Sequence, residues 1–186
     1  DENGDVVDAT LDKIVAGEQS QCVVPLITSD KRKMPVETEF AHGYWNGAPV
    51  LIGVCRDISD RLAAEARQRL AASVFDNAHE GIMITDDKGV IVDVNPTFTE
   101  LTGYSHAEAI GQNADLLRSG HHGSEFYQSM WASIKTQGFW QGEVWNRKKT
   151  GELFAEMLNI SSVKGETGEI THYVAVFSDI TLIKEH

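Results

Sequence analysis

Two short sequence marks occur twice in this chain of 186 residues, and this repeat limits its possible folds more than any other feature. The first mark is an acidic, glycine-containing segment with a Val-Asp run, at residues 1–10 and again at 86–95, and both copies are typical of a β-hairpin. The second mark is an Asp-Ile-Ser or Asp-Ile-Thr triplet that closes a strand-like run, at 57–59 and 179–181. The chain therefore contains one complete module and a shorter relative of it.

The shorter copy lacks the middle of the module. When Gly17 is aligned with Gly138, the missing part falls between Thr10 and Leu11, where the second copy has two or three helices. Either a truncated copy or residues absent from this sequence would explain the difference. We expect an incomplete first domain at 1–59, a connecting helix at 60–78 and a complete second domain at 79–186.

The composition excludes several functional classes. A formal charge of −12 disfavours a nucleic-acid partner, and 41% hydrophobic residues exclude a disordered acidic tail. The longest uncharged stretch, 40–55, contains His42 and Pro49 and is no membrane span. The chain begins with two acidic residues and shows no secretory signal, so we expect a cytoplasmic protein. Cys22 and Cys55 form no C-x-x-C pair, which argues against a disulfide framework or a zinc site.

Residues 60–77 predict an uninterrupted helix, because Ala, Leu, Arg and Glu dominate and both Gly and Pro are absent. Its apolar residues recur at i, i+4 spacing and form a narrow seam of Leu62, Ala66, Leu70 and Val74. A narrow seam suits a partner helix, so one expectation is a homodimer through this helix and the domain surfaces. The alternative is a helix that rests on the sheet of its own domain.

The second copy is predicted to contain two strands, then helices, then three strands. The first two strands are 81–86 and 90–94, helices begin at Pro96 and span 123–136, and the last strands lie near 140–147, 153–162 and 172–179. This order predicts an α+β fold, in which helices cover one face of a five-stranded antiparallel sheet. A cavity is expected between helices and sheet.

The strand near 140–147 suggests a ligand. Period-two alternation places Trp140, Gly142, Val144 and Asn146 on one face, which is apolar but ends in an amide. A buried amide costs about 1–3 kcal/mol unless it finds hydrogen-bond partners. A flat heterocycle with carbonyl and ring-nitrogen edges would satisfy Asn146 and stack on an indole, in the room that Gly142 leaves. A neighbouring helix or a water would satisfy the amide equally.

The same part of the chain carries motifs that resemble PAS sensory domains. These motifs are Asn95-Pro-x-Phe98-x-x-x-Thr-Gly103-Tyr104, the Lys-Thr-Gly151 turn and the closing Asp179-Ile-Thr. The resemblance covers the whole second copy. The first copy resembles the opening hairpin and the last third of a PAS domain, through Met34-Pro-Val-Glu37, Trp45-Asn-Gly47 and Arg56-Asp-Ile-Ser59. The resemblance implies two PAS domains in tandem, the first incomplete.

Several segments of the second copy are similar to the FAD-binding PAS domains of aerotaxis and nitrogen-fixation redox sensors. They are Gly111-Gln-Asn113, Ser119-Gly120, Met130-Trp131, Trp140-Gln-Gly142 and Asn146-Arg-Lys-Lys149. This resemblance implies noncovalent FAD, with Asn113, Leu117, Trp131, Trp140 and Asn146 as cofactor-binding residues. Many PAS domains of cyclic-dinucleotide enzymes share these sequence segments but have no established flavin.

Ala114 separates redox sensing from light sensing. The flavin photoreceptors of this superfamily carry a reactive cysteine directly after the Asn of Gly-x-Asn, and nitrogen-fixation sensors carry a glutamate there. Alanine at this position excludes a cysteinyl adduct. A bound flavin is therefore expected to act through reduction and oxidation, as a sensor of redox state or oxygen.

Two other functions fit the sequence. One is a cofactor-free PAS interaction module, and the other is a haem gas sensor that uses His121 or His122, although adjacent histidines match no metal-binding spacing. No nucleophile motif or P-loop is present, so we expect no catalysis and no catalytic metal. The resemblance implies a bacterial sensor whose downstream output domain is a histidine kinase or a cyclic-dinucleotide enzyme. The first copy has Gln19 and Pro25 in place of Trp140 and Asn146, which predicts a poor flavin site.

Overall fold

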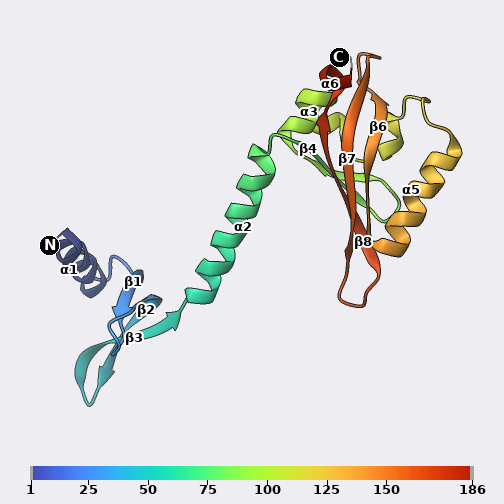
Figure 1. Ribbon diagram of the computed structural model, residues 1–186. Helices are drawn as coiled ribbons and strands as arrows, with labels where there is room; N and C mark the ends of the chain where they lie inside the picture. Colours follow the sequence, from blue (N-terminus) through green and yellow to red (C-terminus); the bar gives the residue numbers. More distant parts are fainter. Residues whose placement is uncertain (1, 185–186) are drawn as a thin grey trace. The chain divides into compact units, whose positions relative to one another are not determined.

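The chain divides into two compact units, residues 1–70 and 71–186, and their larger elements are labelled in Figure 1. The structure is a computed structural model that describes the backbone of residues 2–184 and side chains from Asp8 onward. In this described part, no helix combines the length and the apolar character needed to cross a bilayer.

The first unit consists of one helix and a three-stranded antiparallel sheet. Helix α1 (Glu2–Val15) precedes strands β1 (Gln21–Ile27), β2 (Lys33–Trp45) and β3 (Ala48–Asp57). The prediction of a hairpin at 1–10 is therefore wrong. Thr10 and Leu11, between which the missing part of the module was placed, are consecutive residues of one helix. Residues 5–16 contain neither Gly nor Pro, the strongest helix breakers, and Ile14 is fully buried, so packing of this segment outweighs the modest helix propensity of its Val, Thr and Asp residues.

The second unit contains a five-stranded antiparallel sheet in the order β5-β4-β8-β7-β6. Its strands are β4 (Gly81–Asp86), β5 (Ile91–Val94), β6 (Phe139–Arg147), β7 (Leu153–Lys164) and β8 (Ile170–Asp179). Between β5 and β6 lie helices α3 (Pro96–Thr102), α4 (His106–Ala109), the 3-10 helix η1 (Ala114–Leu117) and α5 (Ser124–Gln137); α6 (Thr181–Lys184) follows β8. The predicted order of two strands, helices and three strands is confirmed.

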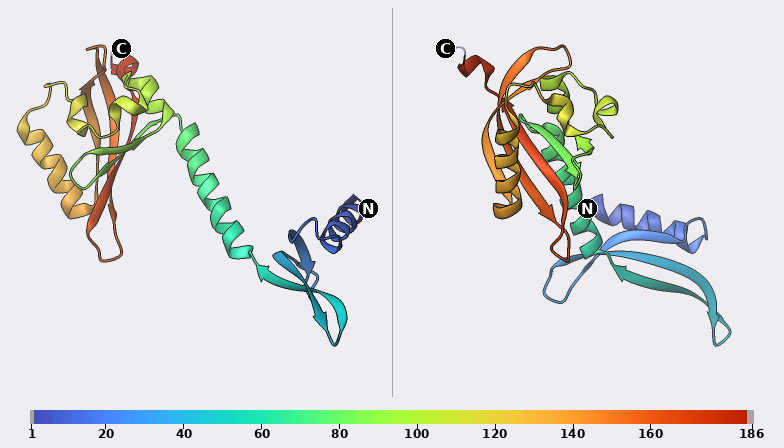
Figure 2. Two further views of the ribbon diagram at one scale, coloured as in Figure 1. Left: turned by 180° about the vertical axis from the view of Figure 1, so that it is seen from behind. Right: turned by 90° about the vertical axis from the view of Figure 1, so that its right-hand side faces the viewer.

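The helices of the second unit share one core with the sheet. Phe98, Ala109, Leu117 and Ile134 each come from a different helix, and they join the inward residues of the strands in one cluster. Helix α5 packs against β6 and β7, along which it runs in Figure 2. The helices thus cover one face of the sheet, and the cavities described below lie between these two layers.

Asn95 holds the beginning of α3 against β4. Its Oδ1 accepts hydrogen bonds from the backbone N–H of Phe98, as a helix N-cap, and of Ile82. Its Nδ2 donates to the carbonyl oxygens of Phe75 and Glu80. The buried amide of the Asn-Pro motif is therefore fully used in joining the end of the connecting helix, the first strand and α3.

The two sheets end in the same hydrogen-bonded turn, which is the second repeated sequence mark. Oδ1 of Asp57 accepts from the backbone N–H of Ser59 at 2.9 Å, and Oδ1 of Asp179 accepts from that of Thr181 at 2.9 Å. The intervening isoleucine N–H donates to the neighbouring strand in both turns, to the carbonyl of Pro35 at 3.1 Å and of Ala155 at 2.8 Å. Strands β1–β3 thus correspond to β6–β8 in order and pairing.

This correspondence shifts one alignment by a residue. Val36 pairs with Asp57, and Glu156 pairs with Asp179, so Val36 corresponds to Glu156. Two residues earlier on the same strands, Met34 corresponds to Phe154. Leu26 lies opposite Met34, and Asn146 lies opposite Phe154. Leu26 and Ser20 are therefore the counterparts of Asn146 and Trp140, in place of the expected Pro25 and Gln19. The shift arises because Gly17 lies three positions before Ser20, whereas Gly138 lies two positions before Trp140.

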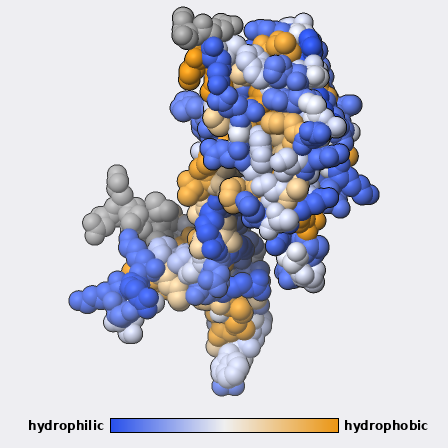
Figure 3. Space-filling view, turned by 45° about the vertical axis from the view of Figure 1, so that its right-hand side comes forward, coloured by the Kyte–Doolittle hydropathy of each residue, from blue (hydrophilic) through white to orange (hydrophobic). Residues whose placement is uncertain are grey.

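The connecting segment forms helix α2 (Ser59–Asn77), as predicted, and it has no buried residue. Leu70 and Val74 of the seam are 66% and 63% exposed, so most of their surface is uncovered. The first unit also exposes large apolar side chains, among them Tyr44 at 80% and Trp45 at 71%. On the face shown in Figure 3, hydrophobic residues, drawn in orange, are scattered among hydrophilic ones.

Candidate functional site

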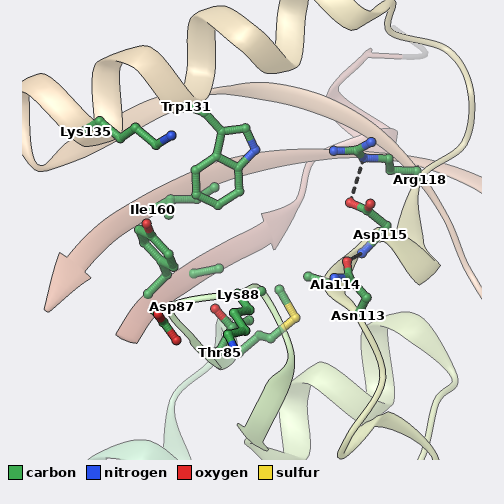
Figure 4. Close-up of a pocket in the computed structure, with 14 residues that line it drawn as sticks. Thr85, Asp87, Lys88, Asn113, Ala114, Asp115, Arg118, Trp131, Lys135 and Ile160 are labelled. Atoms are coloured by element: carbon green, nitrogen blue, oxygen red, sulfur yellow. Dashed lines mark hydrogen bonds and ion pairs between the residues drawn. The ribbon is translucent and has the colours of Figure 1, made fainter. Parts of the chain in front are cut away.

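Two adjoining cavities lie between the sheet and the helices of the second unit. The inner cavity has a volume of about 90 Å³ and is lined by Leu117, Met130, Val144, Asn146, Glu156 and Phe177 among others. The outer cavity, shown in Figure 4, has about 340 Å³ and includes Thr85, Asp87, Lys88, Asn113, Lys135 and Tyr173. Both share lining residues such as Met83, Ala114, Arg118, Trp131 and Ile160, so the outer cavity leads to the inner one.

A buried acid and a buried amide meet in the inner cavity. Asn146 on β6 is 8% exposed, and its Nδ2 donates a 2.8 Å hydrogen bond to Oε1 of Glu156 on β7, which is 2% exposed. Burial raises the pKa of Glu156 to about 8; the Asn146 hydrogen bond opposes this rise, and the negative charge of Asp179 adds to it. The predicted inward orientation of Asn146 is confirmed. Its partner in the structure is a carboxyl group of the neighbouring strand.

Two polar atoms of this region are buried and have no hydrogen-bond partner among the described residues. They are Oε2 of Glu156 and the hydroxyl oxygen of Tyr127 on α5. Both residues line the inner cavity. Burial also raises the pKa of Tyr127, against the nearby charge of Arg118, so this hydroxyl keeps its proton. Buried polar atoms without partners are costly, and a ligand with complementary groups would remove this cost.

Charged side chains surround the outer cavity. Arg118 forms a 2.9 Å ion pair with Asp115, and its guanidinium carbon lies 4.0 Å from the centre of the Tyr127 ring. In Figure 4, Lys88 and Lys135 approach from opposite sides, from the β4–β5 turn and from α5. The outer cavity therefore has a more polar and more highly charged lining than the inner one, which is mainly apolar. This division suits a ligand with an apolar ring and a charged tail.

The five predicted cofactor residues occupy different places. Trp131 lines both cavities and packs edge-to-face on Tyr173 at 5.1 Å, whereas Leu117 and Asn146 line the inner cavity and Asn113 the outer one. Oδ1 of Asn113 caps η1 through the N–H of Asp115. The structure thus brings these four residues to one site.

Trp140 lies apart from these four residues and is not among the lining residues of either cavity. Its ring covers Gly142, where an added Cβ would lie 2.6 Å from Trp140 Cζ2, and it also packs edge-to-face on Phe126, with ring centres 5.7 Å apart. The expectation of room for a flat ligand above Gly142 is therefore corrected, because the indole itself fills that space. A role of Trp140 toward a cofactor stays a prediction.

The two histidines lie in the loop before α5. Nε2 of His122 accepts a 2.9 Å hydrogen bond from the backbone N–H of Trp145, and its ring stacks on Phe126 at 4.0 Å. Burial, together with the charge of His121, lowers the pKa of His122, so the ring is neutral. This nitrogen already serves the loop as an acceptor, and the described residues contain no cluster of metal-binding side chains. The geometry gives the haem hypothesis no support.

The sequence analysis missed Glu156, Tyr127 and Arg118. Glu156 could have been found, because it interrupts the inward series of Phe154, Leu158 and Ile160 along β7. An acid at an inward position of a strand indicates a functional group or a buried hydrogen bond. Arg118 and Tyr127 carried no comparable signal, since a loop arginine and a helical tyrosine are common at surfaces.

Comparison with known families identifies the second unit. The family model described as PAS domain matches residues 79–182. This match covers more than half of the chain, and the chain belongs to the PAS domain family. The five-stranded antiparallel sheet, the helices on one face and the cavity between them are the structural expression of this membership.

Curated relatives include regulators and kinases. The chain is 34% identical over 110 residues to a nitrogen fixation regulatory protein of Klebsiella oxytoca, which covers 59% of this chain and 22% of that protein. It is 31% identical over 126 residues to a blue-light-activated histidine kinase of Rhizobium johnstonii, which covers 66% of this chain and 36% of the kinase. The chain thus spans 22% and 36% of the lengths of these two relatives.

Solved structures share the fold. A PAS domain from Colwellia psychrerythraea is similar with a TM-score of 0.60 and 27% identity, over 62% of this chain and 98% of that structure. A LOV protein of Rhodobacter sphaeroides is similar with a TM-score of 0.54 and 19% identity, over 62% and 68% of the two chains, which supports the fold alone. The second unit is therefore a PAS sensory domain.

Proposed function

We propose that the second unit binds FAD noncovalently and senses redox state or oxygen for a bacterial signalling protein. The observation that carries this proposal is the inner cavity, where Asn146, Glu156 and Tyr127 present polar atoms inside an otherwise apolar enclosure. The 34% identity to a nitrogen fixation regulatory protein supports the same sensor class. Blue-light-activated kinases among the relatives agree with a flavin, since blue light requires a chromophore.

The residues present fit a flavin. The inner cavity of about 90 Å³ is too small for a three-ring system alone, but the outer cavity of about 340 Å³ continues it into the range of ligand sites. Asn146, Glu156 and Tyr127 would hold the polar ring edge, Leu117 and Trp131 its faces, and Lys88 and Lys135 the phosphates. When bound, the flavin supplies reversible one- and two-electron chemistry.

The absence of a thiol favours redox sensing over adduct photochemistry. Both cysteines, Cys22 and Cys55, belong to the first unit, and residues 79–186 contain none. Ala114 lines both cavities at the position where a photoreceptor thiol would stand. A flavin in this site would therefore report through its oxidation state and its hydrogen bonds.

We also propose that the first unit is an incomplete PAS domain, which makes the chain a tandem array. The shared order and pairing of β1–β3 and β6–β8 and the common Asp57 and Asp179 turns support this proposal. Leu26 and Val36 stand where the second unit has Asn146 and Glu156, so this copy lacks the polar pair of a flavin site. A downstream histidine kinase or cyclic-dinucleotide output domain and a cytoplasmic location complete the proposed sensor.

The proposed function is tested by the absorbance spectrum of the purified chain, before and after incubation with FAD and desalting. We expect the two bands of an oxidised flavin, which bleach with dithionite and return in air without a light-induced adduct. A protein that stays colourless after FAD incubation would overturn the proposal. A Soret band in its place would restore the haem hypothesis.

A second candidate function is a cofactor-free dimerisation module. Helix α2 has no buried residue and exposes the seam of Leu62, Leu70 and Val74. On the outer face of the sheet, Ile82, Ile84, Val174 and Val176 form neighbouring pairs and are half-buried. Both surfaces are suited to a second copy. A dimer can also bind a flavin, so the colour of the dimer decides between the two functions. A colourless dimer would favour the interaction module, and a yellow dimer would favour the flavin sensor.

A further inference from the structure

Glu156 is the acid most deeply enclosed in the second unit, with 2% of its surface exposed. Along β7 its inward neighbours are Phe154 and Leu158, and across the β6–β7 pair it lies opposite Val144. These three side chains offer it no hydrogen bond. An ionised carboxylate in such surroundings is strongly disfavoured unless a cation or several donors compensate it.

The charged groups near Glu156 do not supply that compensation. Asp179 on β8 lies opposite it in register and is itself an acid, paired with Lys148 at 3.5 Å. Arg118, which also lines the inner cavity, is paired with Asp115 at 2.9 Å. From α5, the inner cavity receives the hydroxyl of Tyr127 and the indole of Trp131, neither of which is charged. No ion pair in the described part of the chain includes Glu156.

The hydrogen bonds distinguish the two oxygens of this carboxyl group. Oε1 accepts from Nδ2 of Asn146 at 2.8 Å, whereas Oε2 is buried without a partner among the described residues. An oxygen that already accepts a hydrogen bond is the poorer place for the acid proton, so the proton belongs on Oε2. Glu156 then acts as an acceptor toward Asn146 and as a donor toward the cavity.

We propose, on the basis of the flavin site proposed above, that Glu156 stays protonated and donates a hydrogen bond from Oε2 to an acceptor on the edge of the bound heterocycle. Flavin retention is then coupled to the protonation of one side chain. Above the titration of Glu156 the donor is lost, and a negative charge takes its place next to the ring. The raised pKa of Glu156, about 8, puts this change in a range that pH titration can reach.

The test compares FAD affinity of the wild type and two variants at pH 6.5 and pH 9.0, measured by the change in flavin fluorescence. Glu156→Gln keeps one acceptor and one donor but cannot titrate, and Glu156→Met removes both at similar volume. We expect wild-type affinity to fall about tenfold at the higher pH, the Gln variant to be insensitive to pH, and the Met variant to bind about tenfold more weakly at both pH values. Glu152→Gln, at an exposed acid before β7, is the matched control and should behave as the wild type.

A second readout does not depend on affinity. The infrared carbonyl band of a protonated carboxylic acid should be present at pH 6.5, absent in Glu156→Gln, and shifted when FAD is added. If the wild type binds FAD but both variants bind equally well with the same pH dependence, this inference is overturned and the flavin site stands. If the wild type binds no FAD, the proposed function is overturned, and this inference with it.

Discussion

Asn146 and Glu156 are joined by a 2.8 Å hydrogen bond across the β6–β7 hairpin, inside the core of the second unit. Both side chains are buried, and the two strands hold them two positions apart in register. A buried pair of this kind is stable only while each member satisfies the other.

Replacing Glu156 with Gln should change the pH dependence of stability. The native state holds the Glu156 proton up to about pH 8, whereas the unfolded chain releases it near the ordinary value of 4.5. Between these two values the native state binds one more proton, so wild-type stability falls as pH rises, by at most roughly 1.4 kcal/mol per pH unit. Above about pH 8 this contribution becomes constant.

Urea unfolding between pH 5 and pH 9 measures this effect through tryptophan fluorescence. Three of the four tryptophans lie in the second unit, so this signal follows the unit that contains Glu156. The difference in free energy of unfolding between wild type and Glu156→Gln should grow steadily from pH 5 to 8. A difference that is constant with pH would contradict the assigned protonation state, and Glu152→Gln serves as the exposed control.

Replacing Asn146 with Ala should destabilise the second unit by about 1–3 kcal/mol, because Oε1 of Glu156 then loses its donor while it stays buried. A double-mutant cycle with Glu156→Leu isolates the hydrogen bond. We expect the two changes together to cost less than their sum, with a coupling of about 1 kcal/mol or more. Additive effects would show that the two side chains contribute independently. FAD retention should fall in Asn146→Ala at any pH.

Replacing Gly142 with Ala should destabilise the second unit by about 1–3 kcal/mol, because the added Cβ would lie 2.6 Å from Cζ2 of Trp140. The free energy of unfolding from urea titration measures this cost. Trp140→Leu should lower the free energy of unfolding less in the Gly142→Ala background than in the wild type. Gly43→Ala is the matched control in β2, where the new Cβ would meet Ile52 at an ordinary 3.5 Å. Equal effects at the two glycines would argue against the contact with Trp140.

Replacing Leu70 with Asp should convert a dimer into a monomer if α2 forms the proposed interface. Leu70 is 66% exposed, so the substitution removes apolar surface from the seam without disturbing a buried contact. Sedimentation over a range of concentrations measures the change. Gln68→Asp adds the same charge on the opposite side of the helix and should leave the dimer intact. A wild type that is monomeric at all concentrations would contradict this interface.

Much of the second unit could be predicted from its sequence. The glycine turns, the Asn-Pro helix start and the alternation along 140–147 act locally, so they indicated the strands, the helices and the inward side of Asn146 without tertiary information. The first unit was harder. Residues 1–10 resemble the hairpin at 86–95, but a segment with one early glycine and an apolar anchor at Ile14 forms a helix in its own context.

The sequence by itself determined the order of elements in the second unit, the PAS family and the absence of a thiol at Ala114, because these follow from local propensity, motif spacing and residue identity. Only the tertiary structure decided what Asn146 contacts, that the Trp140 ring fills the space above Gly142, and that Tyr127 and Arg118 join the same site. These facts depend on strand register and on which helices cover the sheet, and both are set by packing between segments far apart in the chain. The buried acid Glu156 illustrates the difference. Its inward position in β7 could be inferred from the sequence, but its protonation depends on the burial that the surrounding elements provide.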